Sequence, residues 1–101
     1  MKNVEEIEFA QARELMASGC AFVDVRDGAS YESAHIPGAL HLTDANVGVF
    51  IASSDKAKPV VVYCYHGHSS LGGAAYLLAQ GFERVYSLAG GFESWRRYSM
   101  D

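Results

Sequence analysis

Cys64 is the residue of this sequence best placed for covalent chemistry. It follows the apolar run 60–63 and precedes a polar loop, 65–70, after which a helical pattern begins. A thiol at such a point leaves the carboxyl end of a strand and faces the amino end of a helix, where unpaired N–H groups and the helix dipole favour negative charge. These conditions lower the pKa of a thiol, so the pattern predicts a nucleophilic thiolate at Cys64.

The loop after Cys64 is suited to binding a small anion. Its glycine permits a positive φ, which turns consecutive N–H groups towards a common centre. Its two serines offer hydroxyl donors and can cap the next helix, and its two histidines add positive charge near neutral pH. The predicted substrate-binding residues are Tyr65, His66, Gly67, His68, Ser69 and Ser70.

The same loop lacks the group that phosphate chemistry requires. A cysteine phosphatase needs an arginine six positions after its cysteine, because a planar fork holds the oxygens of the transferring phosphoryl group. That position is Ser70 here. A loop as short as 64–69 should also close around one sulfur more easily than around a tetrahedral phosphate. These features favour sulfur transfer over phosphate hydrolysis.

Composition limits the classes of partner and of cell compartment. The chain has 101 residues, half of them apolar, which suits one compact domain over 1–101. A net charge of −4 and no basic stripe argue against nucleic acid as a partner. The first residues lack the apolar region of a secretory signal and no window is long enough to span a membrane, so we expect a cytoplasmic protein that does not bind membranes. Cys20 and Cys64 are too few for a disulfide scaffold and should be thiols.

Apolar runs alternate with helical patterns along the chain, which predicts an α/β fold with a largely parallel sheet. The expected strands are 7–9, 21–25, 39–42, one opened by Pro59, and 84–88. The expected helices are 10–18, a short one capped by Ser30, one over 44–53 capped by Thr43, one ending at Gly81, and one after Gly91.

Several side chains have predicted structural roles. We expect a salt bridge between Arg26 and Glu32, which would tie the end of the second strand to the helix that follows. Gly72 and Gly73 are costly in a helix, and we expect them to let its first turn lie against neighbouring backbone. His35 is expected to pack beside Pro37.

Four segments in this order resemble the rhodanese-like sulfurtransferase family, and in particular its small single-domain GlpE-type thiosulfate sulfurtransferases. The segments are 24–26, 31–39, 64–70 and 90–95, so the resemblance covers nearly the whole chain. It implies a single rhodanese-like α/β domain with a central, mostly parallel sheet of about five strands and helices on both faces.

The resemblance also implies a double displacement with no metal or organic cofactor. The Cys64 thiolate would attack the outer sulfur of thiosulfate and release sulfite, leaving a persulfide on the enzyme. Cyanide, or a protein dithiol such as thioredoxin, would then remove that sulfur. The loop N–H groups would stabilise the thiolate and the persulfide as an oxyanion hole does. A monomer or a weak homodimer is compatible with the chain length.

Two other classes of function remain open. Cys64, His66 and His68 could bind zinc or copper if His35 or His41 supplied a fourth ligand. Alternatively, the protein could be a persulfide carrier or sensor module that acts only with a partner protein. Turnover on small molecules would separate the carrier from an enzyme.

Overall fold

A five-stranded parallel sheet forms the centre of the molecule. The structure is a computed structural model that describes residues 4–99. The strands lie in the order β1-β5-β4-β2-β3, and every neighbouring pair is parallel. They are β1 (Glu5–Ile7), β2 (Ala21–Asp24), β3 (Leu40–His41), β4 (Val60–Tyr63) and β5 (Val85–Leu88). The predicted α/β fold with a parallel sheet is confirmed.

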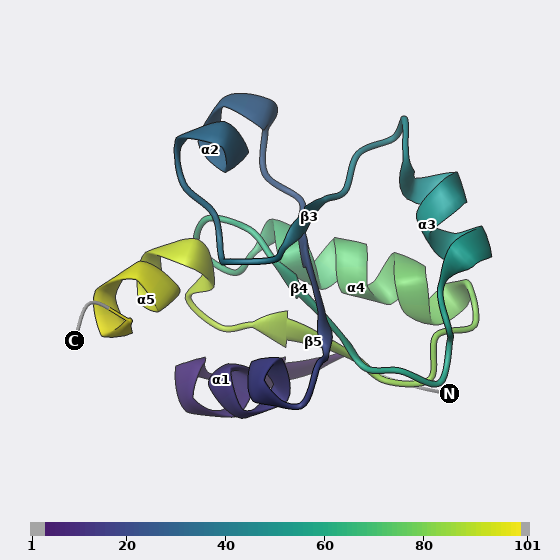
Figure 1. Cartoon of the computed structure of the whole chain (residues 1–101), viewed down its shortest axis with the longest axis horizontal. Helices are drawn as coiled ribbons and strands as arrows, with labels where there is room; N and C mark the ends of the chain where they lie inside the picture. The colour runs from purple at the N-terminus through teal and green to yellow at the C-terminus, as the bar shows by residue number, and fades with distance from the viewer. Residues whose placement is uncertain (1–3, 100–101) are drawn as a thin grey trace.

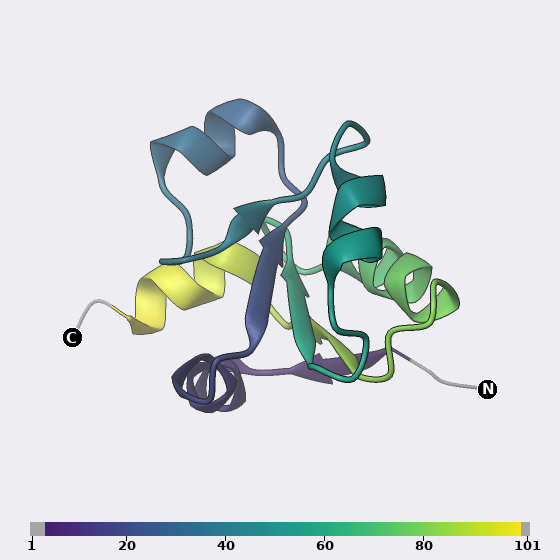
Figure 2. The same cartoon turned by 45° about the vertical axis from the view of Figure 1, so that its right-hand side comes forward.

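Helices cover both faces of this sheet, as predicted (Figure 1). They are α1 (Phe9–Ala17), α2 (Gly28–Ser33), α3 (Val47–Ser53), α4 (Ser69–Ala79) and α5 (Gly91–Tyr98). Helices α1 and α5 lie on one side, and α3 and α4 lie on the other (Figure 2). None of the helices within residues 4–99 has the length and apolar character needed to cross a membrane.

Strand β4 lies near the middle of the sheet and contributes to the core on both faces. All four of its residues are buried, which explains its unbroken apolar sequence. Alternate residues of the strand point to opposite faces of the sheet. Val61 and Tyr63 belong to the core cluster on one face, with Phe22 and Trp95. Val60 and Val62 belong to the cluster on the other face, with Ala74, Leu77 and Phe82. The strand that carries Cys64 at its end is therefore packed on both faces.

Several element boundaries differ from the predicted ones because of local contacts. The first strand ends at Ile7, and Phe9 begins α1, since Glu8 caps that helix in a capping box with Gln11. Strand β3 has only two residues, because only Leu40 and His41 pair with β2. The predicted strands 7–9 and 39–42 were therefore misplaced or too long.

Two predicted helix caps were wrong. Helix α2 is capped by Asp27, whose carboxylate accepts hydrogen bonds from the Ser30 N–H and hydroxyl. Helix α3 begins at Val47, three residues later than expected, because Asn46 bonds both to Thr43 and to the His41 carbonyl and holds the preceding segment in a turn. Asp27 thus caps α2 through its side chain, whereas Asn46 is the N-cap residue of α3 without a capping hydrogen bond from its side chain.

The two glycines in α4 have different surroundings. A Cβ built on Gly73 would lie 3.3 Å from Val62 Cγ1 and 3.5 Å from Val25 Cγ1, whereas a Cβ on Gly72 would meet nothing within 4 Å. The close approach that we expected of both is therefore made by Gly73 alone, and its neighbours are side chains, of Val62 in β4 and of Val25 just after β2, rather than backbone.

Gly72→Ala is expected to stabilise the protein by about 0.5 to 1 kcal/mol, because alanine is the better helix former and the new methyl group has free space. Gly73→Ala should gain less or lose stability, since its methyl group would crowd Val62. Urea unfolding of both variants measures this difference. Equal gains would contradict the packing described for Gly73.

Candidate active site

The sulfur of Cys64 lies just beyond β4, enclosed by the loop that follows. The residue is 5% exposed. The N–H groups of Gly67 and Ser70 lie 3.1 and 3.3 Å from Sγ, and the Ser70 hydroxyl oxygen lies 3.4 Å from it. Gly67 has a φ of +97°, which is the left-handed conformation predicted for the loop glycine and turns its N–H towards the sulfur. The loop therefore forms an anion nest around one sulfur.

These donors favour the thiolate. Burial by itself would raise the pKa of Cys64, because the charged form loses water. The hydrogen bonds outweigh burial, and the pKa lies below its ordinary value. The contributing donors are the Ser70 hydroxyl, the Ser70 N–H, the Gly67 N–H and the His66 N–H. The helix α4, which begins at Ser69, adds its positive end at the same place. The sulfur is thus prepared to act as a nucleophile.

Helix α5 holds the loop from the other side. The Phe92 N–H donates to the Cys64 carbonyl at 2.8 Å, and the Glu93 N–H donates to the Tyr65 carbonyl at 3.1 Å. Such an approach requires Gly91, because a Cβ there would lie 2.5 Å from the Cys64 carbonyl oxygen. Gly67 makes a similar approach, since its Cβ would lie 3.0 Å from the Gly90 nitrogen. The predicted helix after Gly91 therefore supports the cysteine loop directly.

A second serine, Ser87 of β5, contacts the Ser70 hydroxyl. The two hydroxyl oxygens of Ser70 and Ser87 lie 2.7 Å apart, and both residues are fully buried. Sequence reasoning did not select Ser87, because a serine inside the apolar strand β5 carries no local sign of its partner. An unexplained polar residue in a run that otherwise predicts a buried strand was the available signal.

Arg26 is paired with Asp24 and not with Glu32, so the predicted salt bridge was wrong. Its Nη2 lies 2.7 Å from Asp24 Oδ2, and Nε contacts both carboxylate oxygens. The same Nη2 donates to the Ala34 carbonyl, and the guanidinium lies 4.3 Å from the centre of the Phe92 ring. Asp24 is fully buried and needs a cation, whereas Glu32 is exposed and can be solvated. Arg26 thus links β2, α2 and α5.

Not all of the predicted site residues touch the sulfur. Gly67 and Ser70 do, as described above. Four others have exposed side chains on the outside of the loop, where an incoming molecule would meet them. They are Tyr65, His66, His68 and Ser69.

The two histidines considered as a fourth metal ligand lie away from the loop and against Tyr31. His35 and His41 both stack on Tyr31, at 3.9 and 4.8 Å between ring centres. His35 also contacts the Tyr31 carbonyl, and His41 contacts the Arg26 carbonyl. His35 therefore packs on Tyr31. Within residues 4–99, no three His, Cys, Asp or Glu side chains are grouped closely enough to hold a metal ion.

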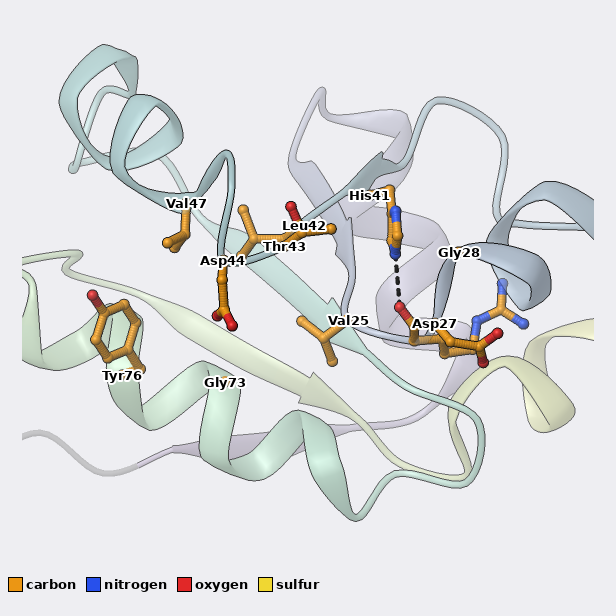
Figure 3. Close-up of a pocket in the computed structure, with 11 residues that line it drawn as sticks. Val25, Asp27, Gly28, His41, Leu42, Thr43, Asp44, Val47, Gly73 and Tyr76 are labelled. Carbon is orange, nitrogen blue, oxygen red and sulfur yellow. Dashed lines mark hydrogen bonds between the residues drawn. The ribbon is translucent and has the colours of Figure 1, made fainter.

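Of two pockets on this molecule, one borders the cysteine loop. One, of about 410 Å³, is lined by Tyr65 of the loop together with Arg26, Phe92 and Arg96. The other, of about 600 Å³, lies between the ends of β2 and β3 and one side of α4 (Figure 3). No residue of the 64–70 loop lines this larger pocket. The smaller pocket is therefore the one adjoining the cysteine loop.

A model of the rhodanese-like domain matches residues 8–98 of this sequence. The chain belongs to the rhodanese-like domain family. The resemblance noted from four segments is thereby confirmed. This rhodanese-like chain is 49% identical over 96 residues to the thiosulfate sulfurtransferase GlpE of Pseudomonas savastanoi pv. phaseolicola, covering 95% of the chain and 91% of that relative. The GlpE protein of Pseudomonas syringae pv. syringae is similar to the same extent.

Solved structures share the fold. A rhodanese-like domain from Anabaena sp. superimposes with a TM-score of 0.81 at 24% identity, over 97% of this chain and 76% of that one. A Rhodopseudomonas palustris protein, described as of unknown function and a possible tyrosine phosphatase, has a TM-score of 0.79 at 30% identity, over 95% and 82% of the two chains. The rhodanese-like sheet and helices described above are therefore common to these proteins.

Gly91→Ala is expected to cost about 3 kcal/mol of unfolding free energy, because the new Cβ would displace the backbone of the cysteine loop in addition to straining φ. Gly19→Ala is the matched control, since Gly19 also has a positive φ, +89°, but open space around it. It should cost only about 1 kcal/mol. Urea unfolding measures both, and equal losses would show that the close approach of α5 contributes nothing.

Ser70→Ala is expected to raise the pKa of Cys64 by about one, since a hydrogen bond to the charged sulfur is lost while the backbone N–H is kept. Alkylation of Cys64 by iodoacetamide should slow about tenfold at pH values below the pKa and remain unchanged well above it. The rate is best followed in a Cys20→Ser background, although burial raises the pKa of Cys20 to about 11 and makes it a poor competitor. An unshifted profile would contradict the role given to this hydroxyl.

Proposed function

We propose that this chain is a thiosulfate sulfurtransferase in which Cys64 carries the transferred sulfur as a persulfide. The observation that carries this proposal is the set of donors aimed at one sulfur, the Gly67 N–H at 3.1 Å, the Ser70 N–H at 3.3 Å and the Ser70 hydroxyl at 3.4 Å. The similarity to GlpE proteins over nearly the full length supports it independently.

In the first half-reaction the Cys64 thiolate attacks the outer sulfur of thiosulfate. A new S–S bond forms to Sγ, the S–S bond of thiosulfate breaks, and sulfite leaves with the bonding electron pair. The product on the enzyme is a persulfide. Because no proton has to be removed when the thiolate is already present, the lowered pKa of Cys64 contributes directly to the rate.

In the second half-reaction an acceptor nucleophile attacks the outer sulfur of the persulfide. With cyanide, a carbon–sulfur bond forms, the persulfide bond breaks, and thiocyanate leaves while the Cys64 thiolate returns. The leaving group is then the same thiolate that the loop donors stabilise, so they favour this step as well. A protein dithiol such as thioredoxin is the acceptor that we propose for the cell.

We assign substrate binding to the loop as predicted. Thiosulfate carries two negative charges, and its sulfonate end must lie outside the nest when its outer sulfur meets Sγ. The exposed residues of the loop are available to contact that end, with His66 and His68 contributing positive charge when protonated. The substrate-binding residues of the proposal are Tyr65, His66, Gly67, His68, Ser69 and Ser70.

Phosphate hydrolysis, which the description of the Rhodopseudomonas palustris protein suggests for that relative, fits this chain less well. The position of the required arginine is Ser70, which is fully buried and donates to the sulfur. Residues 64–70 hold no guanidinium that could bind the oxygens of a phosphoryl group. The loop therefore supports transfer of sulfur rather than of phosphate.

The test is thiocyanate production from thiosulfate and cyanide, with Cys64→Ser as the inactive comparison. Wild-type protein should turn over in the presence of a chelator, and the variant should lose more than about 10³-fold in rate, because the serine hydroxyl is a poor nucleophile at neutral pH. Loss of activity with chelator would support the metal interpretation. Wild-type protein that is folded but inactive, and becomes active only with a partner protein, would support the carrier module.

A further inference from the structure

Among residues 4–99, the hydroxyl of Ser87 has one partner, Ser70, and that partner also contacts the Cys64 sulfur. Ser87 and Ser70 are each fully buried, with their oxygens 2.7 Å apart. Within residues 4–99, Ser87 Oγ forms no other hydrogen bond, whereas Ser70 Oγ also contacts Cys64 Sγ. Three groups thus form a line from β5 through the first turn of α4 to the sulfur.

The protons of this line can be assigned by counting. A hydroxyl has one proton to donate and lone pairs that accept, and a thiolate can only accept. When Cys64 is negative, Ser70 donates to the sulfur and Ser87 donates to Ser70, so every proton has an acceptor. When the thiol donates to Ser70 instead, the Ser70 proton points to Ser87, and the Ser87 proton has no acceptor among the described residues. A buried proton without an acceptor is unfavourable.

We propose that Ser87 is a positioning residue, which orients the Ser70 hydroxyl so that its proton points at Cys64 Sγ. When Ser87 donates to Ser70, the Ser70 proton points at the sulfur, and a hydrogen bond to a thiolate is stronger than one to a neutral thiol, so this polarity favours the nucleophile before substrate arrives. Ser87 does not touch the substrate. This inference rests on the proposed function only in taking the Cys64 thiolate as the reacting group.

Ser87→Ala tests the proposal through the pH dependence of Cys64 alkylation by iodoacetamide, in the Cys20→Ser background. The apparent pKa of Cys64 should rise by about 0.5 to 1, which slows alkylation about three- to tenfold below the pKa and leaves it unchanged well above. In the pH profile of thiocyanate formation, the fall in rate at low pH should move to higher pH by the same amount. An unshifted pKa in a folded variant would overturn the proposal.

Val85→Ala is the matched control. Val85 lies two residues away on the same strand and the same face, and it is 3% exposed. This variant should lose stability without displacing the alkylation profile, because it leaves the hydroxyls in place. A pKa rise in Val85→Ala as large as that in Ser87→Ala would overturn the proposal, since general loosening of β5 would then explain both.

A double-mutant cycle shows whether Ser87 acts through Ser70. In a Ser70→Ala background, Ser87→Ala should leave the pKa of Cys64 unchanged, because the group that it orients is already absent. The double variant should also resist urea better than Ser70→Ala alone, since that single variant leaves the Ser87 hydroxyl buried without a partner. A pKa rise of the same size in both backgrounds would overturn the proposed route.

Alkylation needs neither thiosulfate nor an acceptor, so this test is separate from that of the proposed function. A displaced alkylation profile in a protein that produces no thiocyanate would support the role of Ser87 and reject the sulfurtransferase. Normal thiocyanate turnover by the wild-type protein, with an unshifted alkylation profile in Ser87→Ala, would support the sulfurtransferase and reject the role of Ser87.

Discussion

Stabilising the thiolate form of one buried sulfur is the constraint on which this site depends. Cys64 is 5% exposed, and burial alone would favour the neutral thiol. The charged form is favoured because backbone N–H groups at 3.1 and 3.3 Å, and the Ser70 hydroxyl, replace the lost water. Such donors are effective only while they stay close to these distances, so the chemistry requires a rigid loop.

The rigidity comes from elements that are distant in sequence. The first N–H groups of α5 bind the carbonyls of Cys64 and Tyr65, and Gly91 permits that contact. Behind the loop, Arg26 joins the buried Asp24 to α2 and lies against Phe92 of α5. The end of β2, the start of α5 and the cysteine loop therefore form one connected support, and the carboxyl ends of the parallel strands place it at a single edge of the sheet.

The kind of group that approaches the sulfur explains why the metal and phosphate alternatives fit less well. Each requires side chains to converge on Cys64: imidazoles for a metal, or a guanidinium for phosphate. Here His35 and His41 are held against Tyr31, and the guanidinium of Arg26 is bound by Asp24. Backbone N–H groups and one hydroxyl approach the sulfur instead. A small nest of this kind matches a single polarisable atom better than a large oxyanion.

The sequence by itself determined the alternation of strands and helices, the position of the candidate nucleophile at the end of a strand, and the loop glycine, because these depend on local periodicity and on the φ that one residue can adopt. Boundaries such as the start of α1 at Phe9, and the choice of Asp24 rather than Glu32 as the partner of Arg26, depended on burial, which local sequence does not specify. The pairing of Ser87 with Ser70, and the contact of α5 with the loop, exist only in the tertiary structure. They join residues far apart in the chain, whose partners are decided by how the strands and helices pack.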